Sequence, residues 1–199
     1  MPKKEKKYVR RWYGRSGWET KTVLRGPGGT LTVRTPAGDF QVKESRHQKG
    51  CFTLQNLANK QLVGVYSGRI INERQLALKL SKIAKEKQPF VSQYLVQSHL
   101  HSTPNSNCYL DPTNDHGALD PSWSENPVLY CNEPDPDQTS NLMGVWNYDV
   151  DRLELWARRD ICIGEELLVN YGQSFDREYS TGGACSVMMF KEGVLQAMA

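Results

Sequence analysis

The sequence predicts a mainly β protein (α+β) that is built from small sheets of short strands with one inserted helix. Three observations lead to this expectation. Apolar and polar residues alternate on both sides of the turn residues 36–39, which is typical of a β-hairpin within residues 29–43. Short apolar runs of strand length recur between glycines and polar turns. Only residues 73–87 have the spacing of an amphipathic helix.

The predicted helix has a clear start and a clear stop. Asn72 is a suitable N-cap, and Gln75 stands at the N3 position of a capping box. We expect Pro89 to end the helix because proline cannot donate the backbone hydrogen bond that a helix interior requires. Residues 91–109 are polar and mixed and predict no element.

The other elements are short strands and one long irregular segment. Residues 111–141 are rich in Pro, Asp, Asn and Ser, and loops of this length are typically functional or disordered. The remaining strands are predicted at residues 51–53, 62–66, 69–71, 142–146, 153–157 and 167–170.

Charge is distributed unevenly along the chain. Residues 1–21 hold eight basic residues and two acidic ones, which suits a nuclear-localisation or nucleic-acid-binding arm, or a solubilising tail. Residues 88–151 hold nine carboxylates and neither Lys nor Arg. Such a stretch is either a solvated acidic loop or a surface that attracts a cationic ligand.

The cysteines and the apolar runs exclude other classes of protein. The five cysteines are scattered without a CxxC pair, so we expect neither a zinc cluster nor a disulfide framework, and a reducing compartment fits better. We expect no metal site from the four histidines. The chain begins MPKKEKK, without the apolar core of a signal peptide, and no run of eighteen apolar residues predicts a membrane span.

Five segments carry a resemblance to a known family. The strongest is Arg158–Gly172 (RRDICIGEELLVNYG), in which a turn at Gly164 leads into a short strand that ends on Tyr-Gly. The others are QKGCF (48–52), LVGVYSGRII (62–71), YLD (109–111), and LYCNEP with SNL (129–134 and 140–142). In their order along the chain these segments resemble the motifs of SET-domain protein lysine methyltransferases, and the likeness extends over residues 40–175.

The resemblance implies a fold, a cofactor and a reaction. The fold is one of small β-sheets in which the segment of Asn132 and the segment of Tyr171 cross as a pseudoknot. The methyl donor is S-adenosyl-L-methionine, and the acceptor is a lysine of a basic protein such as a histone tail. The implied division is a basic arm (1–25), the SET domain (26–175) and a C-terminal segment (176–199) without the zinc-binding cysteines of many relatives. A nuclear location follows, in a host cell if the chain is viral.

The resemblance also assigns roles to individual residues. Tyr171 corresponds to the catalytic tyrosine, and Tyr66 lies near the active site or is a tyrosine of the core. Asp111, Asp135 and Val169 are placed with the substrate, and Val169 lies where the degree of methylation is affected. The implied cofactor-binding residues are Gln48, Lys49, Gly50, Asn132, Glu133, Tyr171 and Phe175.

Two departures from the family pattern leave a second function open. Glu133 replaces the usual histidine, and Gln48 replaces the first glycine of Gly-x-Gly. The alternative to an enzyme is an interaction module that keeps the fold with weak or lost catalysis. Phe175, Tyr179 and Phe190 are candidates to stack on adenine or line the lysine channel, or they simply pack in the C-terminal segment.

Overall fold

A computed structural model describes most of the chain, in two compact units. The described residues are 6–8, 21–46, 48–103, 106–148, 152–171, 188–191 and 194–197. Unit 1 comprises residues 1–66 together with 130–199, and unit 2 comprises residues 67–129. Over the described residues as a whole strands outweigh helices, so the predicted mainly β class is confirmed.

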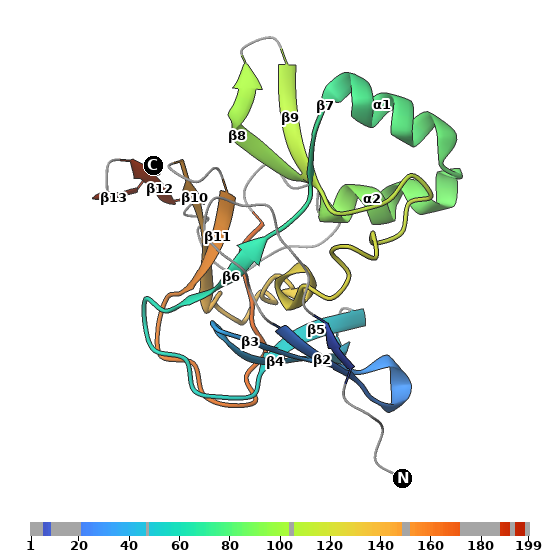
Figure 1. The fold of residues 1–199 in the computed structure, drawn as a ribbon. Helices are drawn as coiled ribbons and strands as arrows, with labels where there is room; N and C mark the ends of the chain where they lie inside the picture. The colour runs from blue at the N-terminus through green and yellow to red at the C-terminus, as the bar shows by residue number, and fades with distance from the viewer. Residues whose placement is uncertain are drawn as a thin grey trace. The chain divides into compact units, whose positions relative to one another are not determined.

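The first sheet of unit 1 is antiparallel and has the order β1-β2-β3-β4-β5 (Figure 1). Its strands are β1 Lys6–Tyr8, β2 Lys21–Arg25, β3 Leu31–Thr35, β4 Gly38–Ser45 and β5 Gln48–Thr53; the 3-10 turn η1 spans Pro27–Gly29. Buried and half-buried residues alternate along β3 and β4, as expected for a sheet with one face on a core. That core contains Val23, Leu31, Val33 and Val42, with Tyr130 packed against it.

The predicted hairpin is confirmed, and a threonine closes its turn. Thr35 pairs with Gly38 at the end of the ladder. The Thr35 hydroxyl accepts hydrogen bonds from the backbone N–H groups of Ala37 and Gly38, both at 3.2 Å. Gly38 has a φ of 153°, a value that side chains rarely tolerate, so the turn depends on glycine at this position.

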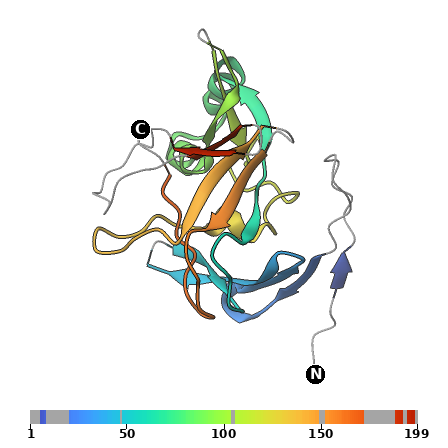
Figure 2. The ribbon, with the colours of Figure 1, turned by 90° about the vertical axis from the view of Figure 1, so that its left-hand side faces the viewer.

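The second sheet of unit 1 has the order β13-β12-β10-β11-β6. Its strands are β6 Leu62–Tyr66, β10 Leu142–Asn147, β11 Arg152–Ala157, β12 Met188–Lys191 and β13 Val194–Ala197. Figure 2 shows β10 and β11 as the paired orange strands. All pairs are antiparallel except β10 with β12. The strands predicted from apolar runs at 62–66, 142–146 and 153–157 are confirmed.

Residues 161–171 pass between two other parts of unit 1. On one side the Leu167 N–H donates to the Cys51 carbonyl (2.7 Å). On the other side the Val169 N–H donates to the Asn132 carbonyl (2.8 Å). The segments of Asn132 and Tyr171 therefore cross as the resemblance implies. A continuous strand at 167–170 does not form; isolated bridges replace it, because the segment changes partner along its length.

Unit 2 contains a three-stranded antiparallel sheet of order β7-β9-β8 and two helices, drawn in green in Figure 1. Asn72 and Gln75 form the predicted capping box, with both hydrogen bonds at 2.9 Å. The single helix predicted over 73–87 is wrong in extent, since α1 ends at Lys82 and a second helix follows. Pro89 lies in the first turn of that second helix, where a missing N–H costs nothing, so it begins a helix and does not end one. The elements are β7 Arg69–Asn72, α1 Glu73–Lys82, η2 Lys85–Lys87, α2 Gln88–Tyr94, β8 Val96–Thr103 and β9 Ser106–Asp111; η3 spans Pro127–Tyr130.

None of the described helices is long and apolar enough to span a membrane.

Candidate functional site

Tyr171 is anchored to the stretch of chain around Asn132. Its hydroxyl donates a hydrogen bond to the Cys131 carbonyl (2.8 Å). Its backbone N–H donates to Oε1 of Glu133 (2.7 Å). Two residues earlier, Val169 is joined to Asn132 by the backbone bond already described. The tyrosine is nevertheless 37% exposed, so part of the residue lies at a surface.

A polar cluster of Asn132, Glu166 and Ser45 lies next to this tyrosine segment. The Glu166 carboxylate accepts hydrogen bonds from the Ser45 hydroxyl (2.8 Å) and from the Asn132 amide (2.9 Å). The same amide nitrogen donates to the Lys49 carbonyl (3.1 Å). The Asn132 amide nitrogen thus donates to both Glu166 and Lys49, and its Oδ1 oxygen is a hydrogen-bond acceptor.

Gly50 is required by this cluster. A Cβ atom added at Gly50 would lie 2.2 Å from Oε1 of Glu166 and 2.8 Å from Cβ of Ser45. Only glycine leaves room for the carboxylate at this point of β5. The resemblance placed Gly50 with the cofactor; the structure shows that Glu166 occupies the space that a side chain at this position would need.

Gln48 and Lys49 precede this glycine at the start of β5. Gln48 has a φ of 70°, a conformation that glycine adopts without cost and other residues rarely adopt. The resemblance assigns the first glycine of the Gly-x-Gly pattern to this position, and the backbone here has a conformation that favours glycine. The Lys49 ammonium donates to the Gly29 carbonyl (3.3 Å), and its own carbonyl holds Asn132 as described above.

A cavity of about 390 Å³ opens beside these residues, within unit 1. Three carboxylates and one guanidinium contribute to its wall, so its charge favours a cationic ligand. The lining residues are Ser45, Arg46, Phe52, Glu133, Asp135, Gln138, Glu166 and Leu168.

Residues 48–172, more than half of the chain, match the family model described as SET domain. The chain belongs to the SET-domain family. No curated protein matches it. Among solved structures it is similar to CpSET8 from Cryptosporidium, at 20% identity over 66% of this chain and 56% of that one, with a TM-score of 0.46. It is also similar to an apo ctPRC2 assembly with E840A and K852D mutations in Ezh2, at 21% identity over 68% of this chain and 15% of that one, with a TM-score of 0.50. The chain thus spans little more than half of the first structure's chain and a small part of the second's.

Asp135 lines the cavity and is paired with Arg46. The two side chains form an ion pair in which the Arg46 guanidinium donates to the Asp135 carboxylate. The hydrogen bond to Asp135 raises the pKa of the Arg46 guanidinium. Asp135 was predicted to contact the substrate, and the structure gives it this internal partner at the edge of the site.

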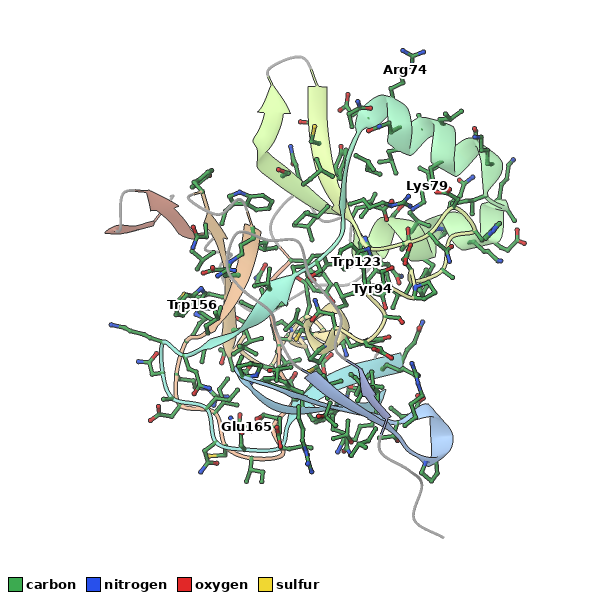
Figure 3. The ribbon with its side chains drawn as sticks, viewed as in Figure 1. Arg74, Lys79, Tyr94, Trp123, Trp156 and Glu165 are labelled. Atoms are coloured by element: carbon green, nitrogen blue, oxygen red, sulfur yellow. The ribbon has the colours of Figure 1, made fainter. Side chains whose placement is uncertain are left out.

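Asp111, also predicted to contact the substrate, has a structural environment in unit 2. Its carboxylate is fully buried and accepts a hydrogen bond from the Lys79 ammonium, which projects from α1 (Figure 3). Lys79 also donates to the Thr113 hydroxyl (2.6 Å) and to the Thr113 carbonyl (2.9 Å). This carboxylate is therefore not exposed for contact with a peptide. It joins α1 to the end of β9.

The other predicted site residues are distributed as follows. Val169 is buried two residues before Tyr171. Tyr66 is the last residue of β6, opposite Leu153 of β11, and so lies on a different sheet from β5. Phe175 lies outside the described residues.

Two carboxylates of the Gly-Glu-Glu motif have different surroundings. Glu166 accepts the hydrogen bonds of Ser45 and Asn132 described above and lines the cavity. Glu165 (Figure 3) accepts hydrogen bonds from the Arg159 guanidinium and from the Cys162 N–H (2.6 Å). The hydrogen bond from the Arg159 guanidinium is the main cause of the lowered pKa of Glu165, and the Cys162 N–H lowers this pKa further. Glu165 therefore fixes the turn, and Glu166 shapes the site.

Two cysteine thiols lie behind the site. Cys51 and Cys131 are both buried. Burial raises the pKa of the Cys51 thiol, and contacts with the Cys131 thiol and the charge of Glu166 raise it further. Within the described part of the chain, no three His, Cys, Asp or Glu side chains gather in a group that could hold a metal ion.

Proposed function

We propose that this chain is an S-adenosylmethionine-dependent protein lysine N-methyltransferase that acts on a basic protein, such as a histone tail. The observation that carries the proposal is the contact of the Tyr171 hydroxyl with the Cys131 carbonyl, directly before Asn132. It places a phenol, a backbone carbonyl and an amide oxygen on neighbouring residues of two crossing segments, in a chain of the SET-domain family.

The residues around the cavity fit the proposed donor. The amino-acid part of S-adenosylmethionine carries an ammonium group, for which the Asn132 Oδ1 oxygen is a suitable acceptor. The nearby carboxylates of Glu133 and Glu166 suit a ligand with positive charge. When bound, the donor supplies a methyl group on a positively charged sulfur, which a neutral amine can take directly.

The protein's part in this reaction is to orient and to desolvate. The lysine must lose its proton before its nitrogen can attack, and burial away from water favours the neutral amine. The Cys131 carbonyl can accept a hydrogen bond from the amine, and the Tyr171 hydroxyl fixes the direction of approach. As the N–C bond forms and the C–S bond breaks, positive charge moves to nitrogen, close to that carbonyl dipole.

The proposed substrate and location rest on charge. Residues 88–151 carry carboxylates without Lys or Arg, and Asp115 and Asp137 of this stretch are exposed. A basic peptide is the partner that this charge attracts. A nuclear location, and contact of residues 1–21 with nucleic acid, are further parts of the proposal; most of that arm lies outside the described residues.

The test is methyl transfer from labelled S-adenosylmethionine to core histones, nucleosomes and unrelated basic proteins. We expect label on one substrate class, and its loss in Tyr171→Phe, which removes only the hydroxyl. Tyr109→Phe on β9 of unit 2 is the matched control and should retain activity. Transfer that is unaffected by Tyr171→Phe would contradict the assigned role of the tyrosine.

A second candidate is a non-catalytic interaction module of the same fold. The observation in its favour is Gln48, whose side chain stands where the family pattern has glycine, at the φ of 70°. Donor binding separates the two candidates: calorimetry that detects no binding of S-adenosylmethionine, together with no transfer, would favour the interaction module.

A further inference from the structure

Glu133 has a contact that its place in the family pattern does not explain. We propose that Glu133 is a positioning residue that holds Tyr171 where its hydroxyl meets the Cys131 carbonyl. This inference rests on the function proposed above, because the position of Tyr171 matters most if the hydroxyl takes part in methyl transfer.

The two hydrogen bonds of Tyr171 described above both end on one short stretch of chain. Glu133 is only 4% exposed, and its Oε1 oxygen accepts the Tyr171 N–H at 2.7 Å. The Tyr171 hydroxyl reaches Cys131, two residues before Glu133, at 2.8 Å. The backbone N–H and the side-chain hydroxyl of the tyrosine are thus both hydrogen-bonded to residues 131–133.

Glu133 acts where the backbone pairing ends. Asn132 and Leu168 form a parallel bridge, and the Val169 N–H donates to the Asn132 carbonyl. Along an extended segment, N–H groups two residues apart point to the same side, so the Tyr171 N–H faces the segment of Asn132 as the Val169 N–H does. A carboxylate takes this N–H in place of a backbone carbonyl, which continues the pairing by one more bond as the chain enters Pro134.

Packing alone does not fix this tyrosine. Tyr171 is 37% exposed, so packing encloses only part of the residue. A group that guides a reacting amine must be held to within about 0.5 Å, and a misplacement of about 1 Å can cost on the order of 100-fold in rate. A buried acceptor at a fixed place supplies such a restraint, because the Tyr171 N–H loses its hydrogen-bond partner when the residue moves away from it.

The experiment compares three substitutions at Glu133 in the full chain. Glu133→Ala removes the acceptor, Glu133→Asp shortens it, and Glu133→Gln keeps an oxygen at the same reach without the charge. Glu86→Ala, at an exposed glutamate of η2 in unit 2, is the matched control and should behave as the unmodified chain. Steady-state methyl transfer gives kcat and the KM for each substrate, and amide hydrogen exchange of Tyr171 reports the contact without any need for activity.

We expect Glu133→Ala and Glu133→Asp to lower kcat by about 10- to 100-fold with the KM for the protein substrate little changed. The KM for S-adenosylmethionine reports separately on the carboxylate that Glu133 contributes to the cavity wall. Exchange of the Tyr171 amide should become at least about tenfold faster, and Glu133→Gln should recover most of both losses. Circular dichroism that matches the unmodified chain establishes that each variant is folded.

Three outcomes would overturn the inference, each in a different way. Unchanged exchange at Tyr171 in folded Glu133→Ala would show that the contact is not a restraint. Faster exchange with unchanged kcat would show that the restraint is irrelevant to transfer. A Glu133→Gln variant as impaired as Glu133→Ala would show that charge, and not the acceptor position, is what matters. An unmodified chain without any transfer would instead refute the proposed function, while the exchange result would still decide whether Glu133 restrains Tyr171.

Discussion

Replacing Gly50 by alanine should destabilise the protein through a defined clash. The new Cβ atom would lie 2.2 Å from Oε1 of Glu166 and 2.8 Å from Cβ of Ser45, whereas ordinary contacts begin near 3.4 Å. The carboxylate must move by more than 1 Å, which breaks its hydrogen bonds to the Ser45 hydroxyl and the Asn132 amide. Overpacking costs about 1–3 kcal/mol, and a hydrogen bond to a charged group contributes about 1.5–3 kcal/mol.

These terms predict a loss of about 3 kcal/mol in the free energy of unfolding, after allowance for the slightly better strand propensity of alanine. The assay is urea denaturation followed by circular dichroism, without any ligand. A double-mutant cycle with Glu166→Ala isolates the cause, because that variant removes the carboxylate that the Cβ meets. In the Glu166→Ala background the cost of Gly50→Ala should fall by at least about 1 kcal/mol; the contact with Ser45 remains. Equal costs in the two backgrounds would refute the argument that Glu166 is what requires glycine at this position.

Three further substitutions test other parts of the structure. Lys79→Met should cost about 3–5 kcal/mol in urea denaturation, because it leaves the fully buried Asp111 carboxylate without its cation, and adding Asp111→Asn should recover part of that loss. Gln48→Gly should raise the free energy of unfolding by about 1 kcal/mol, measured as a higher Tm, since glycine adopts the φ of 70° without strain; an unchanged or lower Tm would contradict this. Because Arg159 lowers the pKa of Glu165 in the folded state, this group stabilises the fold above its unfolded pKa of about 4.3, and the contribution is lost as pH falls through the folded pKa. Glu165→Gln should therefore be less stable than the unmodified chain at pH 7 and approach it in acid, below the folded pKa of Glu165, and a difference that does not depend on pH would contradict the ion pair.

Local patterns were enough to predict the elements whose determinants are local. The hairpin of β3 and β4 follows from alternation around a turn, and the start of α1 follows from the pairing of Asn72 with Gln75. The end of α1 was not predicted, because Pro89 is compatible both with a helix stop and with the first turn of a new helix. Strand β8 and the first part of β9 were missed since residues 91–109 alternate polar and apolar residues too weakly to stand out, whereas the end of β9 coincides with the YLD segment (109–111) of the resemblance.

The candidate site was predictable only as a set of segments. The order of the motifs brought the segments of Gly50, Asn132 and Tyr171 together, but it did not show which side chains join them. Ser45 contacts Glu166 across 121 positions, and Glu133 contacts Tyr171 across 38. No local signal encodes such contacts, so the sequence did not predict that Glu166 joins these segments.

The carboxylates of Glu133 and Glu166 combine two roles that are usually considered separately. Each accepts hydrogen bonds that join crossing segments, and each also places negative charge on the wall of the cavity. Truncation to alanine removes both roles at once, so a loss of activity in such a variant says little about charge. Replacement by glutamine keeps an oxygen acceptor and removes the charge alone. If the cavity receives a cationic donor, glutamine at Glu166 should weaken donor binding while leaving the fold intact, and this separation is what would distinguish an electrostatic role from a structural one.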